Sequence, residues 1–314
     1  MNQVVVERDP LMLYAIAPTQ FTRDGRSVDA SAMAANVERL AESGIRHVLL
    51  TGSYGEFHSL SDSERIAILR RVKATGACES IMACAASLSA EATARLALNM
   101  LDEGADSAMV AAPLACETTE SDVLRHFEYL AKTVGRDLVV YNNPVFGHDL
   151  EPRVMAEVMA MEAFVGVKQG TRDTVRLLGS VEAIRSTARP VQIFIASDLS
   201  AALTLGAPVD GLTSTNAWVF PEAMLGLVAA AGRSDLGAMQ RIHSALAPYR
   251  RVLARAGQPA GVKAAMQIRG FEGSLAVRAP YAECSVEIIN TLRDALVECD
   301  AAIGVSTSPT EVYS

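Results

Sequence analysis

The chain repeats one pattern eight times: a short apolar run followed by a stretch with helical spacing. The apolar runs predict strands at 11–17, 45–50, 80–86, 105–112, 138–141, 164–168, 191–196 and 209–213. Short runs of this kind with few charges are typical of parallel strands that helices cover on both faces. Eight units of roughly 25–30 residues each favour a closed (β/α)8 TIM barrel over an open sheet. No GxGxxG follows the first run, so the dinucleotide-binding alternative lacks its main signal.

The alternation stops after residue 231, which predicts a change of architecture there. We expect the barrel over 1–231, an all-helical C-terminal region over 232–300 and a flexible tail over 301–314. Spacing within the helical region predicts three helices, at 235–256, 259–269 and 283–299.

Charge and cysteine content exclude several classes of function. The formal net charge is −8 and basic residues are scattered, so we expect neither nucleic acid nor an anionic membrane as a partner. Five dispersed cysteines without a CxxC, together with the lack of a signal peptide, favour a reduced cytoplasmic protein. The five histidines show no HxxxH spacing and no GxSxG occurs, so neither a metal site nor a hydrolase triad is predicted.

Lys168 ends the sixth apolar run, directly before the turn that Gly170 opens. An ammonium in an apolar interior is costly, so such a lysine is either paired or has a depressed pKa. A depressed pKa leaves a neutral amine, which can attack a ketone and form a Schiff base. Of the four lysines, only this one ends a predicted strand. A structural ion pair is the alternative that the lysine alone leaves open.

The active site of such a barrel lies at the carboxyl ends of its strands. Other polar residues at these ends are Gly52, Ser53, Tyr54, Tyr141, Thr213 and Ser214. The glycine-flanked turn at 52–55 could hold a carboxylate through its amides and a hydroxyl. A phenol near an iminium can move protons. Each feature alone is equally compatible with an ordinary turn or a rim-filling side chain.

Three motifs in this order resemble the N-acetylneuraminate lyase / dihydrodipicolinate synthase superfamily. They are GSYGE at 52–56, YNNP at 141–144 and GVK at 166–168. The resemblance covers about residues 11–299, including the GLTS segment at 211–214. It implies a (β/α)8 barrel, a lysine Schiff-base lyase that needs no cofactor, a 2-keto acid such as pyruvate as ligand, and a homotetramer built as a dimer of dimers.

The resemblance also implies residue roles. Lys168 would form the Schiff base with the keto carbon, and Tyr141 would move protons to and from the substrate. The Ser53 hydroxyl and the Tyr54 amide, in the turn that Gly52 opens, would hold the carboxylate. Thr213 and Ser214 would line the same rim.

Two departures from the family pattern bear on the substrate. In the synthase, an arginine that grips a second carboxylate stands where this chain has Phe146. No tyrosine follows Pro113, where the synthase and several relatives carry one that completes a proton relay, and Tyr54 could substitute for it. These differences argue against dihydrodipicolinate synthase itself and predict a substrate whose distal end is uncharged or apolar near Phe146.

The leading hypothesis is an aldolase that cleaves a 2-keto acid to pyruvate and an aldehyde, or runs in reverse. A dehydratase of 2-keto-3-deoxy sugar acids, acting through the same iminium, is the alternative. A condensation of the dihydrodipicolinate synthase type, or a non-catalytic protein that binds a keto acid, is less favoured.

Overall fold

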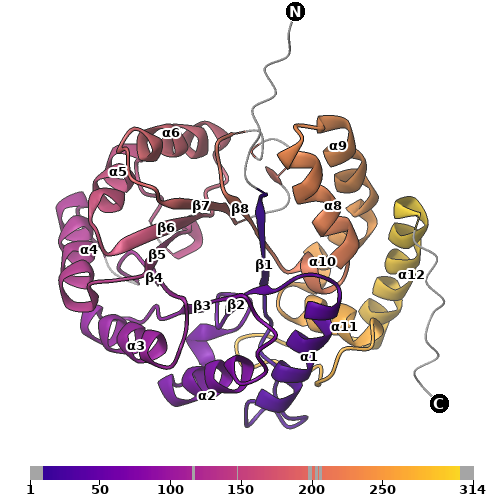
Figure 1. Cartoon of the computed structure of the whole chain (residues 1–314). Coiled ribbons are helices and arrows are strands. Elements are labelled where there is room, and N and C mark those ends of the chain that lie inside the picture. Colours follow the sequence, from indigo (N-terminus) through magenta and orange to yellow (C-terminus); the bar gives the residue numbers. More distant parts are fainter. Residues whose placement is uncertain are drawn as a thin grey trace, which may run out of the picture.

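The eight strands close into one parallel barrel in sequence order, which confirms the predicted TIM barrel (Figure 1). The computed structural model describes residues 10–114, 117–146 (without the Phe146 side chain), 148–196, 200, 201, 204 and 207–304. The strands are β1 Met12–Ile16, β2 His47–Leu50, β3 Ser80–Cys84, β4 Ser107–Ala111, β5 Leu138–Asn142, β6 Phe164–Gln169, β7 Gln192–Ile195 and β8 Gly211–Ser214.

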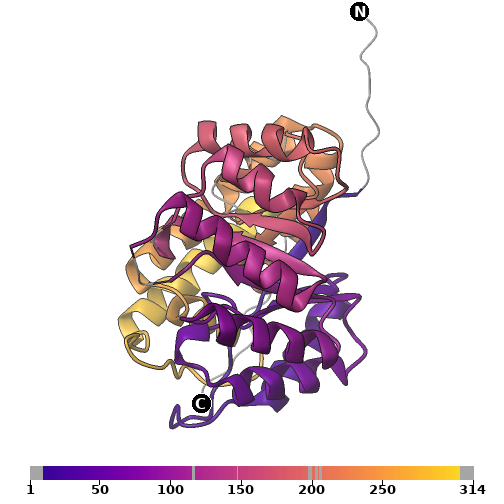
Figure 2. The same ribbon diagram turned by 90° about the vertical axis from the view of Figure 1, so that its left-hand side faces the viewer.

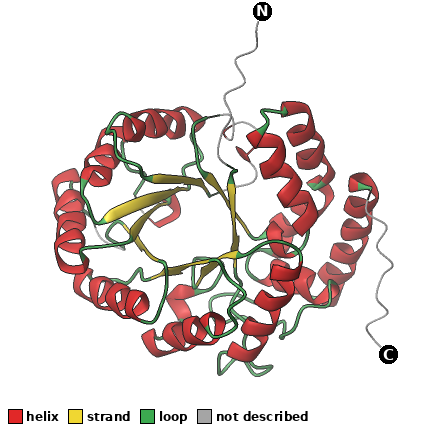
Figure 3. Ribbon diagram, in the orientation of Figure 1, coloured by secondary structure: helices red, strands yellow, loops and turns green. Residues whose placement is uncertain are grey.

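Helices surround the barrel as an outer ring (Figure 3). They are α1 Ala30–Glu42, α2 Asp62–Lys73, α3 Ala90–Asp102, α4 Glu120–Val134, α5 Pro152–Ala160, α6 Thr174–Arg185 and α8 Pro221–Gly232. Side-chain caps fix where several of them begin. The segment Ser61-Asp62-Ser63-Glu64 predicts a capping box, and it is present at α2: the Ser61 hydroxyl accepts from the Glu64 amide and the Glu64 carboxylate accepts from the Ser61 amide. The sequence also predicts a helix over 198–205 with Asp198 as its cap, but this helix falls mostly on residues that the structure does not describe.

The buried apolar residues form two layers. The larger layer lies between the strands and the surrounding helices. The smaller one fills the inside of the barrel with inward-facing side chains: Tyr14, Ile16, Leu49, Phe57, Met82, Cys84, Ala86, Met109, Ala111, Val139, Tyr141 and Phe194. The barrel is therefore a packed core, and chemistry is confined to its rim.

A bulge in β6 reverses which face its side chains occupy. Leu138 of β5 pairs with Phe164, but the next residue, Val139, pairs with Gly166, so Val165 is an extra residue. Phe164 and Val167 both belong to the outer layer although they are three positions apart, an odd number. Strict alternation would put them on opposite faces. The bulge thus brings Lys168, the neighbour of Val167, to the inside of the barrel.

Four C-terminal helices pack beside α8 and α1 on one side of the barrel (Figures 1 and 2). They are α9 Leu236–Ala245, α10 Ala247–Ala256, α11 Ala260–Ile268 and α12 Val286–Ile303. The single helix predicted over 235–256 was wrong, because the chain turns at Leu246. Pro248 has no amide hydrogen to continue the first helix and instead sits in the first turn of α10.

The last helix extends into the segment 301–314 that was predicted to be a tail. α12 runs to Ile303 and Gly304 caps it with a left-handed conformation, so 301–303 are helical. Residues 305–314 lie outside the described part of the chain. None of the helices described here is long and apolar enough to cross a membrane.

Candidate active site

Lys168 lies inside the carboxyl end of the barrel, next to Tyr141 on the neighbouring strand. The two residues are register partners in the β5–β6 pair. The Lys168 Nζ atom lies 3.9 Å from the centroid of the Tyr141 ring. Only 1% of Lys168 is exposed, which makes it one of the largest fully buried side chains of the protein.

Burial sets the acid–base behaviour of this lysine. Desolvation lowers the pKa of Lys168 to about 7, and the nearby Cys84 thiol opposes that shift only weakly. No carboxylate forms an ion pair with Lys168 among the described residues. Among these residues, the structural ion pair that the sequence left open is not present. A substantial fraction of neutral amine at neutral pH is the property that a Schiff-base nucleophile requires.

Two polar side chains orient the Tyr141 phenol. Its oxygen lies 3.4 Å from the Ser53 hydroxyl, and the Asn143 amide nitrogen donates to it at 2.8 Å. Burial raises the pKa of Tyr141, while the hydrogen bonds from Ser53 and Asn143 lower it. The phenol thus stays protonated at neutral pH next to the amine, and Ser53 connects it to the glycine-flanked turn.

The turn after β2 is held in an unusual backbone conformation. Thr51 and Glu56, at its two ends, have φ of 51° and 57°. A Cβ on Gly55 would meet the Gly52 nitrogen at 3.0 Å and the Ala17 carbonyl at 3.1 Å, so no side chain fits there. The amides of Gly55 and Glu56 donate back to the carbonyls of Gly52 and Ser53. This tight loop brings Ser53 to the phenol, and Tyr54 packs against the inner layer.

The two expected residues of β8 differ in what their hydroxyls do. The Thr213 side chain is fully buried, and its hydroxyl has no hydrogen-bond partner among the described residues. Its register partner is Tyr14 of the inner layer. The Ser214 hydroxyl accepts from the Asn216 amide at 3.0 Å. Thr213 is thus the better candidate for a ligand contact, because a buried orphan hydroxyl gains most from a partner.

A buried polar network anchors the segment after β5. The Asn142 side chain donates to Gln169 at 2.6 Å and to Asp149 at 3.2 Å, and accepts from the Leu150 amide. The network ties both ends of the 143–149 segment to β5 and β6. Phe146 belongs to the short 3-10 helix Pro144–Phe146 within that segment, but its side chain is outside the described atoms.

Sequence reasoning missed two features of this region. It gave Asn143 no role, although the YNNP motif contains it, because nothing in a sequence shows which neighbour an amide will contact. It placed Lys263 only near a helix start, whereas Lys263 forms a fully buried ion pair with Glu56. That pair joins residues 207 positions apart. The glutamate of GSYGE was the available signal.

No group of three His, Cys, Asp or Glu side chains that could hold a metal ion occurs in the described parts of the chain. The groups described at the rim are the Lys168 amine, the Tyr141 phenol and a few hydroxyl and amide groups.

Comparison with known proteins shows which family and which fold this chain shares. A model of the dihydrodipicolinate synthetase family matches residues 11–299. A 4-hydroxy-tetrahydrodipicolinate synthase of Methanoculleus marisnigri is 28% identical and aligns over 89% of this chain and 96% of its own length. An uncharacterized DapA-like lyase of Halobacterium salinarum is 30% identical over 84% of this chain and 87% of its own.

Solved structures share the fold. YagE, a prophage protein of this family from E. coli K12 solved in complex with pyruvate, superposes with a TM-score of 0.85 at 22% identity, covering 92% of this chain and 98% of its own. For a putative dihydrodipicolinate synthetase of Pseudomonas aeruginosa the TM-score is 0.84 at 24% identity, with coverage of 92% and 99%.

Proposed function

The chain belongs to the dihydrodipicolinate synthetase family, and from that premise we propose that it is a Schiff-base aldolase acting on a 2-keto acid. The observation that carries the proposal is the buried Lys168, which has the Tyr141 phenol beside it and no carboxylate partner among the described residues. Four relatives of the chain, at 26–28% identity, are named 4-hydroxy-tetrahydrodipicolinate synthase, which supports an enzyme of this kind.

In the proposed reaction the neutral Lys168 amine attacks the keto carbon, and water leaves to give a protonated imine. The bond between C3 and C4 then breaks, and its electron pair moves into the imine to form an enamine. The C4 hydroxyl loses its proton as the aldehyde forms. Protonation at C3 and hydrolysis of the imine release pyruvate and the free lysine. In this scheme Tyr141 carries the protons and the turn at Ser53 holds the carboxylate.

We further propose that the aldehyde partner is uncharged or apolar at its distal end. Val145, in the segment after β5, is 69% exposed, and Leu88, in the segment after β3, is 79% exposed. Both follow carboxyl ends of strands, where a substrate enters. Apolar side chains there, together with Phe146 in place of an arginine, favour an apolar group over a second carboxylate.

The test of the reaction is covalent trapping. Purified protein is incubated with pyruvate and borohydride, and the masses of the intact protein and of its tryptic peptides are measured by mass spectrometry. We expect one adduct on the peptide containing Lys168, and none in Lys168→Ala. The absence of an adduct with pyruvate and with larger 2-keto acids would exclude the proposal. Binding of pyruvate without an adduct or turnover, seen as a thermal shift, would instead indicate a non-catalytic keto-acid-binding protein.

The test of the substrate class uses a panel of aldehydes with pyruvate. We expect faster condensation with apolar aldehydes than with carboxylate-bearing aldehydes of the same size. Phe146→Arg should reverse that order, with Val145→Ala as a neighbouring control that does not. Loss of water from a hydroxylated 2-keto acid without release of pyruvate would identify the dehydratase, which uses the same imine but expels hydroxide from C4 after the C3 proton leaves.

The tetramer implied by the resemblance also stays a proposal. Val175 and Leu178 lie three residues apart on α6 and are 81% and 37% exposed, which supports a contact on that helix face. Light scattering of the wild type and of Val175→Asp measures it. A wild type that is monomeric at micromolar concentration would contradict the proposal.

A further inference from the structure

Glu56, the last residue of the GSYGE turn, is held by the C-terminal region. Its Oε1 atom accepts from the Lys263 Nζ atom at 2.6 Å, and both side chains are completely buried. Its Oε2 atom accepts from the Arg278 backbone amide at 2.8 Å. Both carboxylate oxygens are therefore bound by groups that lie more than 200 positions away along the chain.

Lys263 is fixed as firmly as its partner. Its Nζ atom also donates to the Ala276 carbonyl at 2.7 Å and lies 4.4 Å from the centroid of the Phe21 ring. These contacts leave the ammonium well satisfied, as a buried cation requires. Lys263 thus differs from Lys168, which is equally buried but has no carboxylate beside it in the part of the chain that the structure describes.

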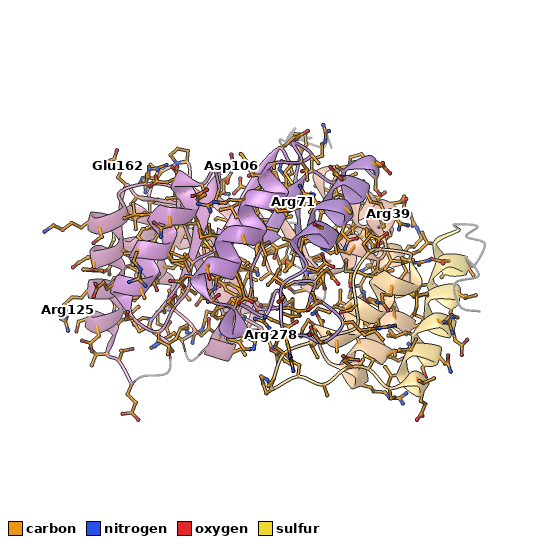
Figure 4. The ribbon with its side chains drawn as sticks, turned by 90° about the horizontal axis from the view of Figure 1, so that it is seen from below. Arg39, Arg71, Asp106, Arg125, Glu162 and Arg278 are labelled. Atoms are coloured by element: carbon orange, nitrogen blue, oxygen red, sulfur yellow. The ribbon has the colours of Figure 1, made fainter. Side chains whose placement is uncertain are left out.

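The side chain of Arg278 adds further contacts between the C-terminal region and the segment that follows the turn. Its guanidinium binds Glu64 of α2 at 2.6 and 3.0 Å and the Ser59 carbonyl at 2.9 Å. Its guanidinium carbon also lies 4.5 Å from the centroid of the Phe21 ring, which Lys263 contacts too. Figure 4 shows Arg278 where the early part of the barrel meets the C-terminal helices. The segment after GSYGE is therefore attached to the C-terminal region at both Glu56 and Ser59.

The attachment matters because the turn is strained. Thr51 and Glu56 both adopt left-handed backbone conformations, which are unfavourable for a residue with a side chain. Such a conformation persists only where the surroundings enforce it. Ser53, which reaches the Tyr141 phenol, lies between these two residues.

We propose that the Glu56–Lys263 ion pair is a positioning pair that holds the Ser53–Tyr54 turn in the shape needed to bind the substrate carboxylate. This inference rests on the proposed function in assigning the carboxylate to that turn. The pair does not touch the reacting atoms, so it acts on substrate affinity and leaves the amine chemistry of Lys168 intact.

The experiment measures the rate of adduct formation at Lys168 against pyruvate concentration. Glu56→Gln should raise the half-saturating concentration by about 10- to 100-fold, as expected for a displaced binding group, while the maximal rate and its pH profile change far less. The matched control is Asp300→Asn, which weakens a different and only partly buried ion pair, that between Arg269, at the end of α11, and Asp300 of α12 at 2.6 Å. It should lower stability without changing the half-saturating concentration.

Two further arms keep the inference decidable. If Glu56→Gln fails to fold, the neutral double variant Glu56→Gln/Lys263→Met replaces it, because it leaves no buried charge without a partner. Hydrogen exchange of the 51–57 peptide should increase in either variant, while the 164–169 peptide stays protected. This readout needs no substrate. It remains valid if the wild type forms no adduct, an outcome that would refute the proposed function alone.

An unchanged half-saturating concentration in a folded variant that forms the adduct would overturn the positioning role. Where no adduct forms even in the wild type, unchanged exchange of the 51–57 peptide would overturn it. An equal increase in both peptides would also overturn it, because the pair would then support the whole fold and not the turn.

Discussion

Two lysines in this chain are almost completely buried, but their amino groups have different surroundings. Lys263 has the Glu56 carboxylate 2.6 Å away. Among the described residues, Lys168 has the Tyr141 ring and the Cys84 thiol close by, and burial lowers its pKa to about 7. The difference arises from one partner, Glu56, that approaches one amine and not the other. The proposed reactivity of Lys168 therefore depends on burial without a neighbouring carboxylate of the kind that Lys263 has.

The lowered pKa predicts how imine formation depends on pH. Only the neutral amine attacks a ketone, and a pKa of about 7 makes half of Lys168 neutral at that pH. We expect the initial rate of adduct formation with pyruvate to rise as the pH increases through about 7 and to level off above it. A rate that keeps rising tenfold per pH unit to about 10 would show an ordinary lysine pKa. Lys168→Ala gives the background.

Asn143 provides a second prediction at the residue scale. Its amide donates to the Tyr141 oxygen at 2.8 Å and lowers a phenol pKa that burial raises. In Asn143→Leu the pKa of Tyr141 should rise and turnover should fall by about 10- to 100-fold, because a misaligned phenol transfers protons poorly. The peptide containing Lys168 should still be trapped.

A double-mutant cycle tests that assignment. If Asn143 acts through the phenol, Asn143→Leu should have little effect in a Tyr141→Phe background. An equal loss in both backgrounds would show that Asn143 acts on the substrate or on the loop.

At the scale of the element, β6 is the part that aims the nucleophile. Its bulge at Val165 turns Lys168 inward, and Gly166 allows β7 to approach, since a Cβ there would lie 2.9 Å from the Gln192 carbonyl oxygen. That oxygen belongs to backbone that pairs with β6 and has no room to withdraw.

We expect Gly166→Ala to push β6 away from β7 and to displace Lys168. Adduct formation should fall by about 100-fold, in line with a shift of about 1 Å, and the melting temperature should fall as well. Gly179→Ala on α6, in the same βα unit, is the matched control. Its Cβ would meet only Pro152 at 3.4 Å, and alanine favours a helix, so stability should hold or rise. Similar behaviour of the two variants would contradict the role of the close approach.

The sequence predicted these elements well wherever the signal was local. The apolar runs located all eight strands, and Ser61 with Glu64 predicted the start of α2. Pro248 was also a local signal of the turn at Leu246, but the apolar spacing on either side of it predicted one continuous helix. The bulge at Val165 and the Glu56–Lys263 pair depend on pairing between strands and on contacts 207 residues apart. The spacing of apolar residues along the chain predicts neither the bulge nor the ion pair.

At the scale of the whole molecule, the C-terminal helices and the barrel share one set of buried contacts. Trp218, the only tryptophan, donates to the Ile16 carbonyl at 2.8 Å and packs against Phe271, with ring centroids 5.7 Å apart. The Asn36 side chain binds the backbone of Glu272 through both its donor and its acceptor. The boundary proposed near residue 231 thus separates two architectures that depend on each other.

We therefore expect a single unfolding transition. Trp218 fluorescence, which reports the contact between the two regions, should change at the same denaturant concentration as the far-ultraviolet circular dichroism. A protein shortened to residues 1–231 should fail to give a cooperative transition, because it would leave Glu56 buried without Lys263. A separate earlier transition in fluorescence would show that the helical region unfolds on its own.

The bulge in β6 makes the site sensitive to chain length as well as to residue identity. Many replacements at Val165 would leave the strand's count of residues unchanged and keep the amine facing inward. Removing that one residue would leave Gly166 opposite Val139 and Lys168 opposite Tyr141, so the amine would still face inward. One residue inserted between Gly166 and Lys168 would instead shift Lys168 by one position and turn the amine toward the helices, although every functional side chain would still be present. Such a single-residue insertion should abolish adduct formation as completely as removing the lysine itself.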